Sequence, residues 1–361
     1  MKPVKIDVKI PGRAYPVYIG RNLSVPKHLN AVLKTDRAVI VTDRNLRSGL
    51  AAKIAASLKK SGVSADLYAL PCGEIAKSLK ELERLYAFLL RKKVERRTPL
   101  IAVGGGTVGD AAGFAAATYF RGLPLIHIPT TLLAQVDSAI GGKTAVNHPL
   151  AKNAVGTFYH PRAVLADVDA LKSLPKVEFH AGMAEVVKYA LVFDPAFARF
   201  LESSWRRIAA GDGSTRIKMI AACVRWKAKV VAEDELDLSG RRELLNFGHT
   251  LGHALESATG FSRYRHGEAV AWGMRAAAAL SVFRGGLRRT DGALSSRLLN
   301  RLPALRRPAN VTDKRLFAAL KADKKVTGGR NVFILLDKIG RPRRVTDVLK
   351  EEISAAVEEI G

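Results

Sequence analysis

Two histidines lie one helical turn apart in residues 246–253, NFGHTLGH. In a helix, residues four positions apart share one face, so the imidazoles of His249 and His253 can converge on one point. His266 lies nearby in the sequence, and Glu185 lies on another expected helix. Catalytic zinc takes three nitrogen or oxygen ligands and keeps one position open, so this set predicts a metal site. The spacing leaves open whether both His249 and His253 are ligands or one of them transfers protons.

A glycine-rich turn at residues 104–110, GGGTVGD, satisfies the pattern G-x-G-x-x-G. Glycines let backbone N–H groups approach a pyrophosphate at a helix N-terminus, although a simple tight turn has the same composition. An acidic residue is expected about 20 positions later in such sites, but residues 125–131 contain none. Asp43, upstream of the turn, is the acidic candidate for binding a ribose. The sequence therefore predicts a dinucleotide site that differs from the standard Rossmann pattern.

Cations and amides that could bind an anion recur along the chain. Lys143 follows a glycine pair, and Lys152 and Asn153 lie in the next expected loop. The later half adds four more cations: Lys188, Lys227, Arg242 and Lys324. Each alone is typical of a solvated surface charge. Collected in one site they would bind phosphate and carboxylate, with arginine favoured for bidentate contacts.

The elements that must position these residues differ between the two halves of the chain. In the first half, apolar runs at residues 38–42, 65–70, 99–103 and 123–128 predict strands, and residues 48–60 and 78–92 predict helices. Strands that alternate with helices are typical of a parallel α/β sheet.

After about residue 175, helical periodicity dominates, with helices expected at residues 178–193, 197–209, 216–232, 244–258 and 268–283. The only clear strand signal there is at residues 331–336. We therefore expect a Rossmann-like α/β domain at residues 1–175 that binds NAD, and a mostly helical domain at residues 176–361 that binds metal and substrate. The active site is expected in the cleft between them.

Composition narrows the class of protein. The 361 residues include 59 Lys and Arg against 33 Asp and Glu, a net charge of +26. The cations are spread along the chain and aromatic residues make up only 7%, which argues against a nucleic-acid binder. Two distant cysteines exclude a disulfide framework. No apolar run reaches the ~18 residues of a membrane span, and no signal segment is recognisable, so we expect a cytoplasmic protein.

Several strings together resemble one family. They are GEIAK (73–77), GGGTVGD (104–110), YFRG (119–122), PTTLLAQVDS (129–138), GGKT (141–144), KN (152–153), AGMAEVVK (181–188), LNFGHTLGH (245–253), HGE (266–268) and DKK (323–325). In this order they resemble the 3-dehydroquinate synthase family of sugar-phosphate cyclases, from about residue 40 to residue 340.

The resemblance assigns roles to individual positions. Glu185, His249 and His266 match the metal ligands, zinc or a similar ion such as Co²⁺, and His253 matches an active-site histidine. The positions that match the NAD site are Asp43, Asn45, Glu74, Lys77, Gly105, Gly106, Thr107, Asp110, Thr130, Thr131, Lys143, Lys152 and Ser173. The positions that match substrate contacts are Asp137, Lys143, Asn153, Lys188, Lys227, Arg242, Asn246 and Lys324. Arg121 matches a residue that reaches into the neighbouring subunit, which implies a homodimer.

The resemblance also implies the reaction. Family members convert 3-deoxy-D-arabino-heptulosonate 7-phosphate to 3-dehydroquinate and phosphate in the shikimate pathway. A transient oxidation by NAD acidifies a C–H bond, phosphate leaves, the same NADH reduces the product, and ring opening and an aldol step follow. No membrane or nucleic-acid partner is expected.

The sequence departs from the family pattern in the loop at residues 234–242, which is one residue longer and carries Leu236 where arginine is usual. The substrate contact could therefore be Arg241 instead of Arg242. Ala139 stands where a serine is common. Two alternative functions remain: a cyclase that makes a deoxy-inosose or a valiolone, and a metal-dependent polyol dehydrogenase.

Overall fold

The computed structural model describes residues 2–260, 263–303, 307, 311–322, 326–327 and 330–360. The chain forms two compact units. The first contains the chain up to Leu174 together with Arg216–Leu236, and the second contains Pro175–Thr215 and the chain from Asp237 onward. Within the described part of the chain, no helix combines the length and the apolar character needed to cross a membrane.

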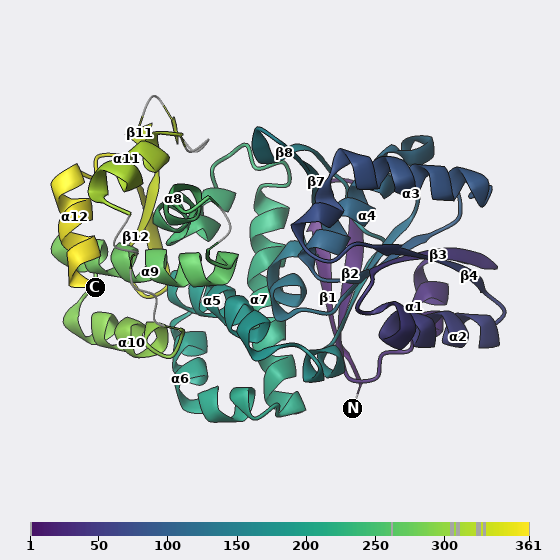
Figure 1. The fold of residues 1–361 in the computed structure, drawn as a ribbon. Helices are drawn as coiled ribbons and strands as arrows, with labels where there is room; N and C mark the ends of the chain where they lie inside the picture. The colour runs from purple at the N-terminus through teal and green to yellow at the C-terminus, as the bar shows by residue number, and fades with distance from the viewer. Residues whose placement is uncertain are drawn as a thin grey trace. The chain divides into compact units, whose positions relative to one another are not determined.

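A seven-stranded sheet forms the centre of the first unit (Figure 1). Only the pair at one edge, β1 and β2, is antiparallel, and every other neighbour pairs in parallel. The order across the sheet is β1 (Val4–Ile10), β2 (Arg13–Gly20), β9 (Ala163–Asp167), β6 (Leu125–Pro129), β5 (Leu100–Gly104), β3 (Arg37–Asp43) and β4 (Ser64–Leu70). The predicted α/β fold class is confirmed, whereas β1, β2 and β9 were not anticipated.

Helices cover both faces of this sheet. Successive residues of a strand point to opposite faces, so Val39 and Val41 of β3 pack with α3 (Leu79–Arg91) and α4 (Gly106–Thr118). Ala38 and Ile40 pack on the other face with α1 (Val25–Val32) and α2 (Ala52–Lys60). These strands are buried on both sides, which explains why their sequences read as continuous apolar runs.

A hairpin of β7 (Lys143–His148) and β8 (Ala151–Phe158) lies outside the main sheet. A Cβ at Gly113 of α4 would come 2.5 Å from Thr144 of β7, so helix and hairpin are in close contact. The hairpin therefore has a fixed place beside the helix that follows the glycine turn.

The second unit is mostly helical. Its helices are α5 (Lys176–Phe193), α6 (Pro195–Ala209), α8 (His249–Ala258), α9 (His266–Phe283), α10 (Arg289–Leu299), α11 (Asp313–Ala322) and α12 (Lys350–Glu359). The helix α7 (Gly213–Glu233) belongs to the first unit from Arg216 onward. Strand β12 (Phe333–Lys338), expected at residues 331–336, pairs with β13 (Arg341–Val345), which was not anticipated; β10 (Val326–Thr327) pairs with β11 (Arg330–Asn331).

One expected helix, residues 244–258, is two elements. A 3-10 helix covers Arg242–Asn246, and Gly248 has a φ of +79°, a left-handed conformation that suits glycine. A Cβ there would also lie 2.5 Å from Met274 in α9. The prediction of one continuous helix is wrong, but α8 begins at His249 and so keeps His249 and His253 one turn apart.

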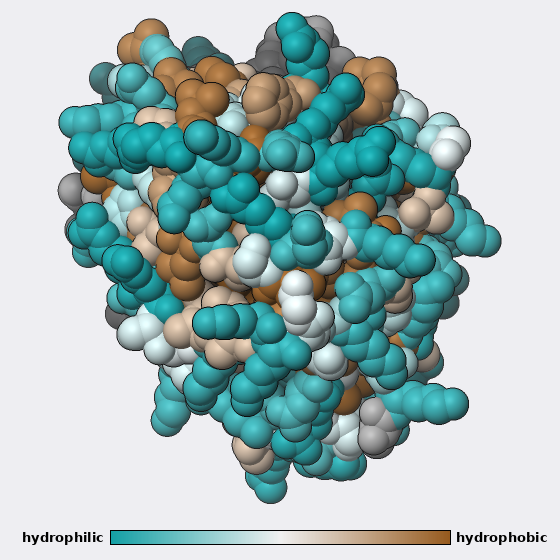
Figure 2. Space-filling view, turned by 90° about the vertical axis from the view of Figure 1, so that its right-hand side faces the viewer, coloured by the Kyte–Doolittle hydropathy of each residue, from teal (hydrophilic) through white to brown (hydrophobic). Residues whose placement is uncertain are grey.

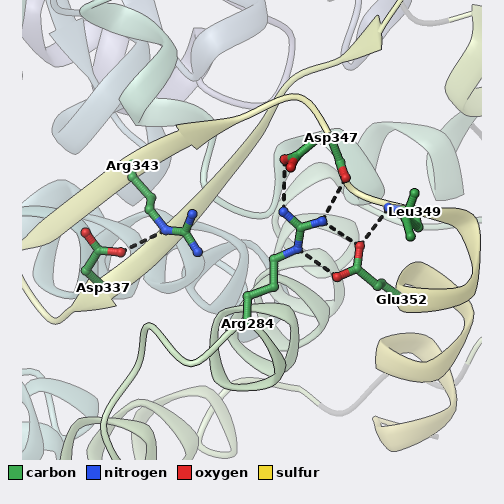
Figure 3. A network of polar contacts seen from close by, with 6 residues as sticks. All are labelled: Arg284, Asp337, Arg343, Asp347, Leu349 and Glu352. Atoms are coloured by element: carbon green, nitrogen blue, oxygen red, sulfur yellow. Dashed lines mark hydrogen bonds and ion pairs between the residues drawn. The ribbon is translucent and has the colours of Figure 1, made fainter.

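Arg284 at the end of α9 joins three segments of the second unit (Figure 3). Its guanidinium donates to Glu352 Oε1 at 2.8 Å and to Glu352 Oε2 at 2.6 Å, and to Asp347 Oδ1 at 2.9 Å. Glu352 Oε2 also accepts from the backbone N–H of Leu349 at 2.7 Å, which caps α12. The nearby Arg343 bonds to Asp337 at 2.8 Å. One planar cation therefore fixes the start of the last helix against α9.

The face drawn in Figure 2 is mostly hydrophilic, with hydrophobic residues interspersed. This matches the wide distribution of the 59 Lys and Arg along the sequence.

We expect Arg284→Lys to lower the free energy of unfolding by about 1–2 kcal/mol, because lysine keeps the charge but cannot bond two oxygens of Glu352 at once. Arg341→Lys is the control, since Arg341 lies 3.8 Å from Asp337 and is 71% exposed, and it should change stability by less than ~0.5 kcal/mol. Urea unfolding of the three proteins measures this. Equal losses in both variants would contradict the role given to the bidentate contact.

His127 in β6 generates a pH prediction. Burial lowers the pKa of its imidazole from 6.5 to about 4, so the folded protein disfavours the charged form. As the pH falls, the unfolded chain binds this proton before the folded protein does. The contribution of the neutral His127 to the free energy of unfolding should therefore be fully present above pH 6.5 and be lost as the pH drops towards 4, by up to about 3 kcal/mol. His127→Leu should remove this part of the loss of stability at acid pH. Parallel stability-versus-pH curves for the variant and the wild type would show that His127 does not contribute.

Candidate active site

Three imidazoles converge in the second unit. His249 and His253 come from α8, and His266 is the first residue of α9. The ring centroids lie 5.4 Å apart for His249 and His253, 5.4 Å for His249 and His266, and 5.7 Å for His253 and His266. One nitrogen from each ring lies within 4.8 Å of the others. The three imidazoles therefore form one geometric group.

Glu185 of α5 brings a carboxylate to the same place. Its Oε1 lies 3.3 Å from His249 Nε2 and 3.6 Å from His266 Nε2, and its other oxygen contacts the ammonium of Lys188. The side chain is 1% exposed, yet neither oxygen receives a hydrogen bond of good geometry from the residues that the structure describes. A buried carboxylate that faces two imidazole nitrogens fits a divalent metal ion.

The surroundings shift the pKa values of these three groups in different directions. Burial raises the pKa of Glu185, but Lys188 and His249 outweigh it and hold the pKa well below its ordinary value. Burial lowers the pKa of His249 to about 4, so this ring is neutral and can donate a lone pair. For His266 burial acts in the same direction, but Glu185 and Glu256 outweigh it and raise the pKa to about 9.

Close contacts between helix backbones place these donors. A Cβ at Gly267 would lie 2.2 Å from the carbonyl oxygen of Ala181, so α9 begins directly against α5. A Cβ at Gly273 would lie 2.0 Å from the carbonyl oxygen of Gly248, so α8 begins directly against α9. Only glycine permits these approaches, and they bring three helices close enough for their short side chains to meet.

The other predicted residues of the second unit lie beside this cluster in the sequence. Arg242 is 3% exposed, and Arg241 and Asn246 are half-buried. The structure brings Lys188 onto the candidate ligand Glu185 instead of leaving it in solvent. Lys324 lies outside the described residues.

The glycine turn of the first unit joins β5 to α4. A Cβ at Gly105 would lie 3.0 Å from Thr131 Cγ2, and one at Gly106 would lie 3.0 Å from Ser138 Oγ. The N–H of Thr130 bonds to the carbonyl of Gly104 at 2.9 Å. The predicted residues Thr130 and Thr131 therefore line this turn, as does the half-buried Thr107, and the N-terminus of α4 opens beside them.

Three further predicted residues form one polar group. Lys77 Nζ lies 2.6 Å from Asp110 Oδ2 and 2.5 Å from Asn153 Oδ1. Burial raises the pKa of Asp110, although Lys77 opposes this. Asn153 has a φ of +54°, a left-handed conformation that is uncommon outside glycine and concentrates at functional sites. Glu74 lies nearby and accepts from Asn147 Nδ2 at 2.7 Å, which ties the predicted cofactor residues to the β7–β8 hairpin.

Asp137 and Lys227 form an ion pair at 2.7 Å within the first unit. Lys227 is 6% exposed and lies on the part of α7 that packs with that unit. Through this pair, α7 contacts the segment that begins at Thr130 and Thr131 and contains Asp137.

Asp43 ends β3, next to β5, where Thr42 pairs with Val103. Parallel strands place their carboxyl ends at one edge, so Asp43 lies at the edge that carries the glycine turn. Its Oδ1 accepts from the N–H of Asn45 at 2.9 Å. Among the described residues, no hydrogen bond or ion pair joins Asp43, Asn45 or Ser173 to the turn. Asn45 and Ser173 are exposed, as are Lys143 and Lys152 of the hairpin.

Three residues that the sequence analysis did not single out surround the turn before Lys143. Tyr15 Oη accepts from the N–H of Gly141 at 3.0 Å, and His160 Nε2 lies 3.2 Å from Glu235 Oε1. Gly142 has a φ of +72°, and a Cβ there would lie 2.9 Å from the His160 ring. The three residues come from distant segments, so no local sequence pattern could have identified them.

Comparison with known proteins gives a consistent result. Models of the 3-dehydroquinate synthase N-terminal and C-terminal domains match residues 67–181 and 182–326. The chain is 44% identical to 3-dehydroquinate synthase of Nitrosospira multiformis over 339 residues, 93% of this chain and 92% of that protein.

Two solved structures are also similar. The 2-epi-5-epi-valiolone synthase of Streptomyces hygroscopicus, with NAD⁺ and Zn²⁺ bound, has a TM-score of 0.87 at 29% identity over 98% of each chain. A 2-deoxy-scyllo-inosose synthase complexed with carbaglucose-6-phosphate, NAD⁺ and Co²⁺ has a TM-score of 0.85 at 28% identity over 99% of each chain.

The donor cluster predicts one divalent ion per chain. His266→Ala should lose the ion and activity together, because it removes a converging donor, whereas His253→Ala should keep the ion and lose turnover. Metal content after dialysis, measured by mass spectrometry, tests both variants. A metal-free His253→Ala protein beside a metal-loaded His266→Ala protein would reverse the two roles.

Proposed function

The chain belongs to the 3-dehydroquinate synthase family, and from that premise we propose that it converts 3-deoxy-D-arabino-heptulosonate 7-phosphate to 3-dehydroquinate and phosphate. It is a carbon–oxygen lyase of the shikimate pathway, which leads to the aromatic amino acids. The observation that carries this conclusion is the 44% identity to a 3-dehydroquinate synthase over 93% of the chain. The identity to the valiolone and deoxy-inosose synthases is 29% and 28%, which favours the dehydroquinate reaction.

The cofactors are NAD and a zinc-like divalent ion. We assign the ion to Glu185, His249 and His266, supported by their converging donor atoms and the burial of the Glu185 carboxylate among them. We assign NAD to the edge of the sheet in the first unit, with the pyrophosphate at the glycine turn. When bound, NAD supplies a reversible hydride acceptor, and the ion supplies a Lewis acid for the reacting hydroxyl.

The residues of the proposed NAD site would bind the cofactor through open space for backbone contacts and through charged side chains. Gly105 and Gly106 leave room for backbone N–H groups at the start of α4 to face phosphate oxygens. Lys77, held by Asp110 and Asn153, provides a cation of fixed position in the same region. Asp43 at the end of β3 can accept hydrogen bonds from a ribose. These contacts would hold the nicotinamide ring in one orientation while substrate is oxidised and reduced.

We assign substrate binding to a set of cations and amides. Its members are Lys143, Asn153, Lys188, Lys227, Arg242, Asn246 and Lys324, with Asp137 holding Lys227 in place. Phosphate and carboxylate bring about three negative charges, which ionised partners bind most strongly when they are shielded from water. The burial of Arg242 at 3% exposure supports it over Arg241 as the substrate contact. The net charge of +26 adds long-range attraction for such an anion.

His253 is the candidate for moving a proton. Its imidazole is half-buried and faces the rings of His249 and His266, so it lies at the donor cluster without being needed to complete three ligands. An imidazole at this place can both take a proton from a substrate hydroxyl and return one.

We also propose a homodimer in which Arg121 contributes to the neighbouring active site. Phe120 and Arg121 have φ values of +46° and +59°, an unusual pair of left-handed residues. Phe120 is 50% exposed and Arg121 is exposed as well. Such strain costs on the order of 1–3 kcal/mol per residue and persists where the conformation has a use. Presentation of both side chains to a second subunit would be such a use.

The catalytic role of NAD gives a direct test. We expect the purified protein with its metal and NAD to release phosphate from 3-deoxy-D-arabino-heptulosonate 7-phosphate without accumulating NADH, because each hydride returns to the substrate. A coupled phosphate assay with absorbance at the NADH band measures both quantities. Stoichiometric NADH release without phosphate would indicate a polyol dehydrogenase.

The proposed substrate cations give a second test. Lys143→Ala and Arg242→Ala should each lower kcat/KM by a hundredfold or more, on the order of 3 kcal/mol, because a phosphate or carboxylate loses its partner. Lys59→Ala and Lys60→Ala, in the last turn of α2, should change it little. If all four substitutions lowered kcat/KM equally little, and activity fell only with added salt, the overall charge of the protein alone would attract the substrate. A large loss of kcat/KM in Arg241→Ala with no loss in Arg242→Ala would show that Arg241 is the substrate contact.

A further inference from the structure

Glu256 lies on α8, three residues after His253, and the family resemblance assigned it no role. Its side chain is 11% exposed. Its Oε2 lies 3.5 Å from His266 Nδ1, while Nε2 on the opposite side of that ring lies 3.6 Å from Glu185 Oε1. The imidazole of His266 therefore lies between two carboxylates, one on each nitrogen.

His249 has the same arrangement with a different acceptor. Its Nδ1 lies 3.3 Å from the carbonyl oxygen of Phe247, and its Nε2 lies 3.3 Å from Glu185 Oε1. In both rings Nδ1 faces a hydrogen-bond acceptor and Nε2 faces Glu185. An imidazole that binds a metal ion is neutral and carries one N–H, so a proton held at Nδ1 leaves the lone pair at Nε2, directed into the cluster.

From this geometry we propose that Glu256 is a positioning residue that accepts the Nδ1 proton of His266 and so fixes the ring and tautomer that bind the metal ion. The inference rests on the proposed metal site and deepens it. Histidines that bind metals commonly donate their second nitrogen to a carboxylate or a backbone carbonyl, and loss of that partner weakens metal binding by about 10–100-fold.

A purely structural role for Glu256 explains less. The residue lies in the last turn of α8, where the helix dipole disfavours a negative charge. Within the described part of the chain, His266 is the one group in ion-pair or hydrogen-bonding contact with its carboxylate. Burial of a carboxylate costs free energy unless a partner offsets it, and His266 is that partner.

The test is zinc affinity, measured on metal-free protein by competition with a chelating dye. Glu256→Gln keeps an acceptor but loses the charge, and should weaken zinc binding about tenfold. Glu256→Ala removes the acceptor and should weaken it by up to about a hundredfold. The d–d absorption bands of the Co²⁺-loaded protein should also change, since a misplaced imidazole alters the ligand geometry.

Glu178→Gln is the matched control. It removes the same charge from α5, but Glu178 Oε1 bonds to Arg265 at 2.8 Å and touches none of the three histidines. Its zinc affinity should equal that of the wild type. Zinc affinities of both Glu256 variants equal to that of the control would overturn the proposal, as would a lower melting temperature of the metal-free Glu256→Gln protein with unchanged zinc affinity.

The wild type separates this inference from its premise. A wild-type protein that binds no zinc would remove the proposed metal site itself, whereas normal zinc binding in the wild type with no effect of Glu256→Gln would remove only the role of Glu256. If Glu256→Ala does not fold, the comparison of Glu256→Gln with Glu178→Gln decides alone.

Discussion

The arrangement of the second unit depends on one buried carboxylate. Glu185 is 1% exposed and ionised, and burial of such a charge costs several kcal/mol unless cationic or metal partners offset it. Its partners come from Lys188 on its own helix and from His249 and His266 on two others. Glycine contacts between the helix backbones make this convergence sterically feasible. The same interaction that satisfies the carboxylate therefore defines where a metal ion would bind.

The first unit carries the proposed NAD site, where few specific side chains would bind a long dinucleotide. The carboxyl ends of β3 and β5 meet at one edge, and the N-terminus of α4 opens there beside Thr130 and Thr131. The β7–β8 hairpin then brings Asn153 to Lys77 and Asp110. In the proposed NAD site, backbone groups would supply the phosphate contacts and this polar network would set their surroundings, so the usual downstream acidic residue would not be needed.

Local sequence patterns predicted the elements that are regular and buried. The apolar runs around Val39, Ile101 and Ile126 predicted parallel strands because both faces of those strands are covered. Patterns failed where tertiary contacts decide the structure. Helical periodicity runs through Phe247 and Gly248, but Gly248 has a left-handed φ of +79°, and close packing on Met274 leaves no room for a side chain there. Residues 151–158 (AKNAVGTF) contain no continuous apolar run and gave no strand signal; β8 forms there by pairing with β7.

The same limit applies to the candidate site. Spacing singled out His249 and His253 with His266 and Glu185 as further donors, and the resemblance assigned the ligand roles to Glu185, His249 and His266. Glu256 shares a helical face with His249 and His253, but neither it nor the group of Tyr15, His160 and Glu235 shows its role in the sequence, because their partners lie on other segments. Such supporting residues become visible only when the fold brings them to the groups that they hold.

The central claim is that a carboxylate and two imidazoles hold the metal ion, although the geometry brings a third imidazole to the same cluster. X-ray absorption at the zinc edge tests this most directly, on the wild type and on Glu185→Ala. We predict two imidazole nitrogens at about 2.0–2.1 Å together with oxygen donors in the wild type, and weak or absent zinc binding in the variant. Three imidazoles in both proteins, with full zinc occupancy, would contradict the account and make His253 a ligand.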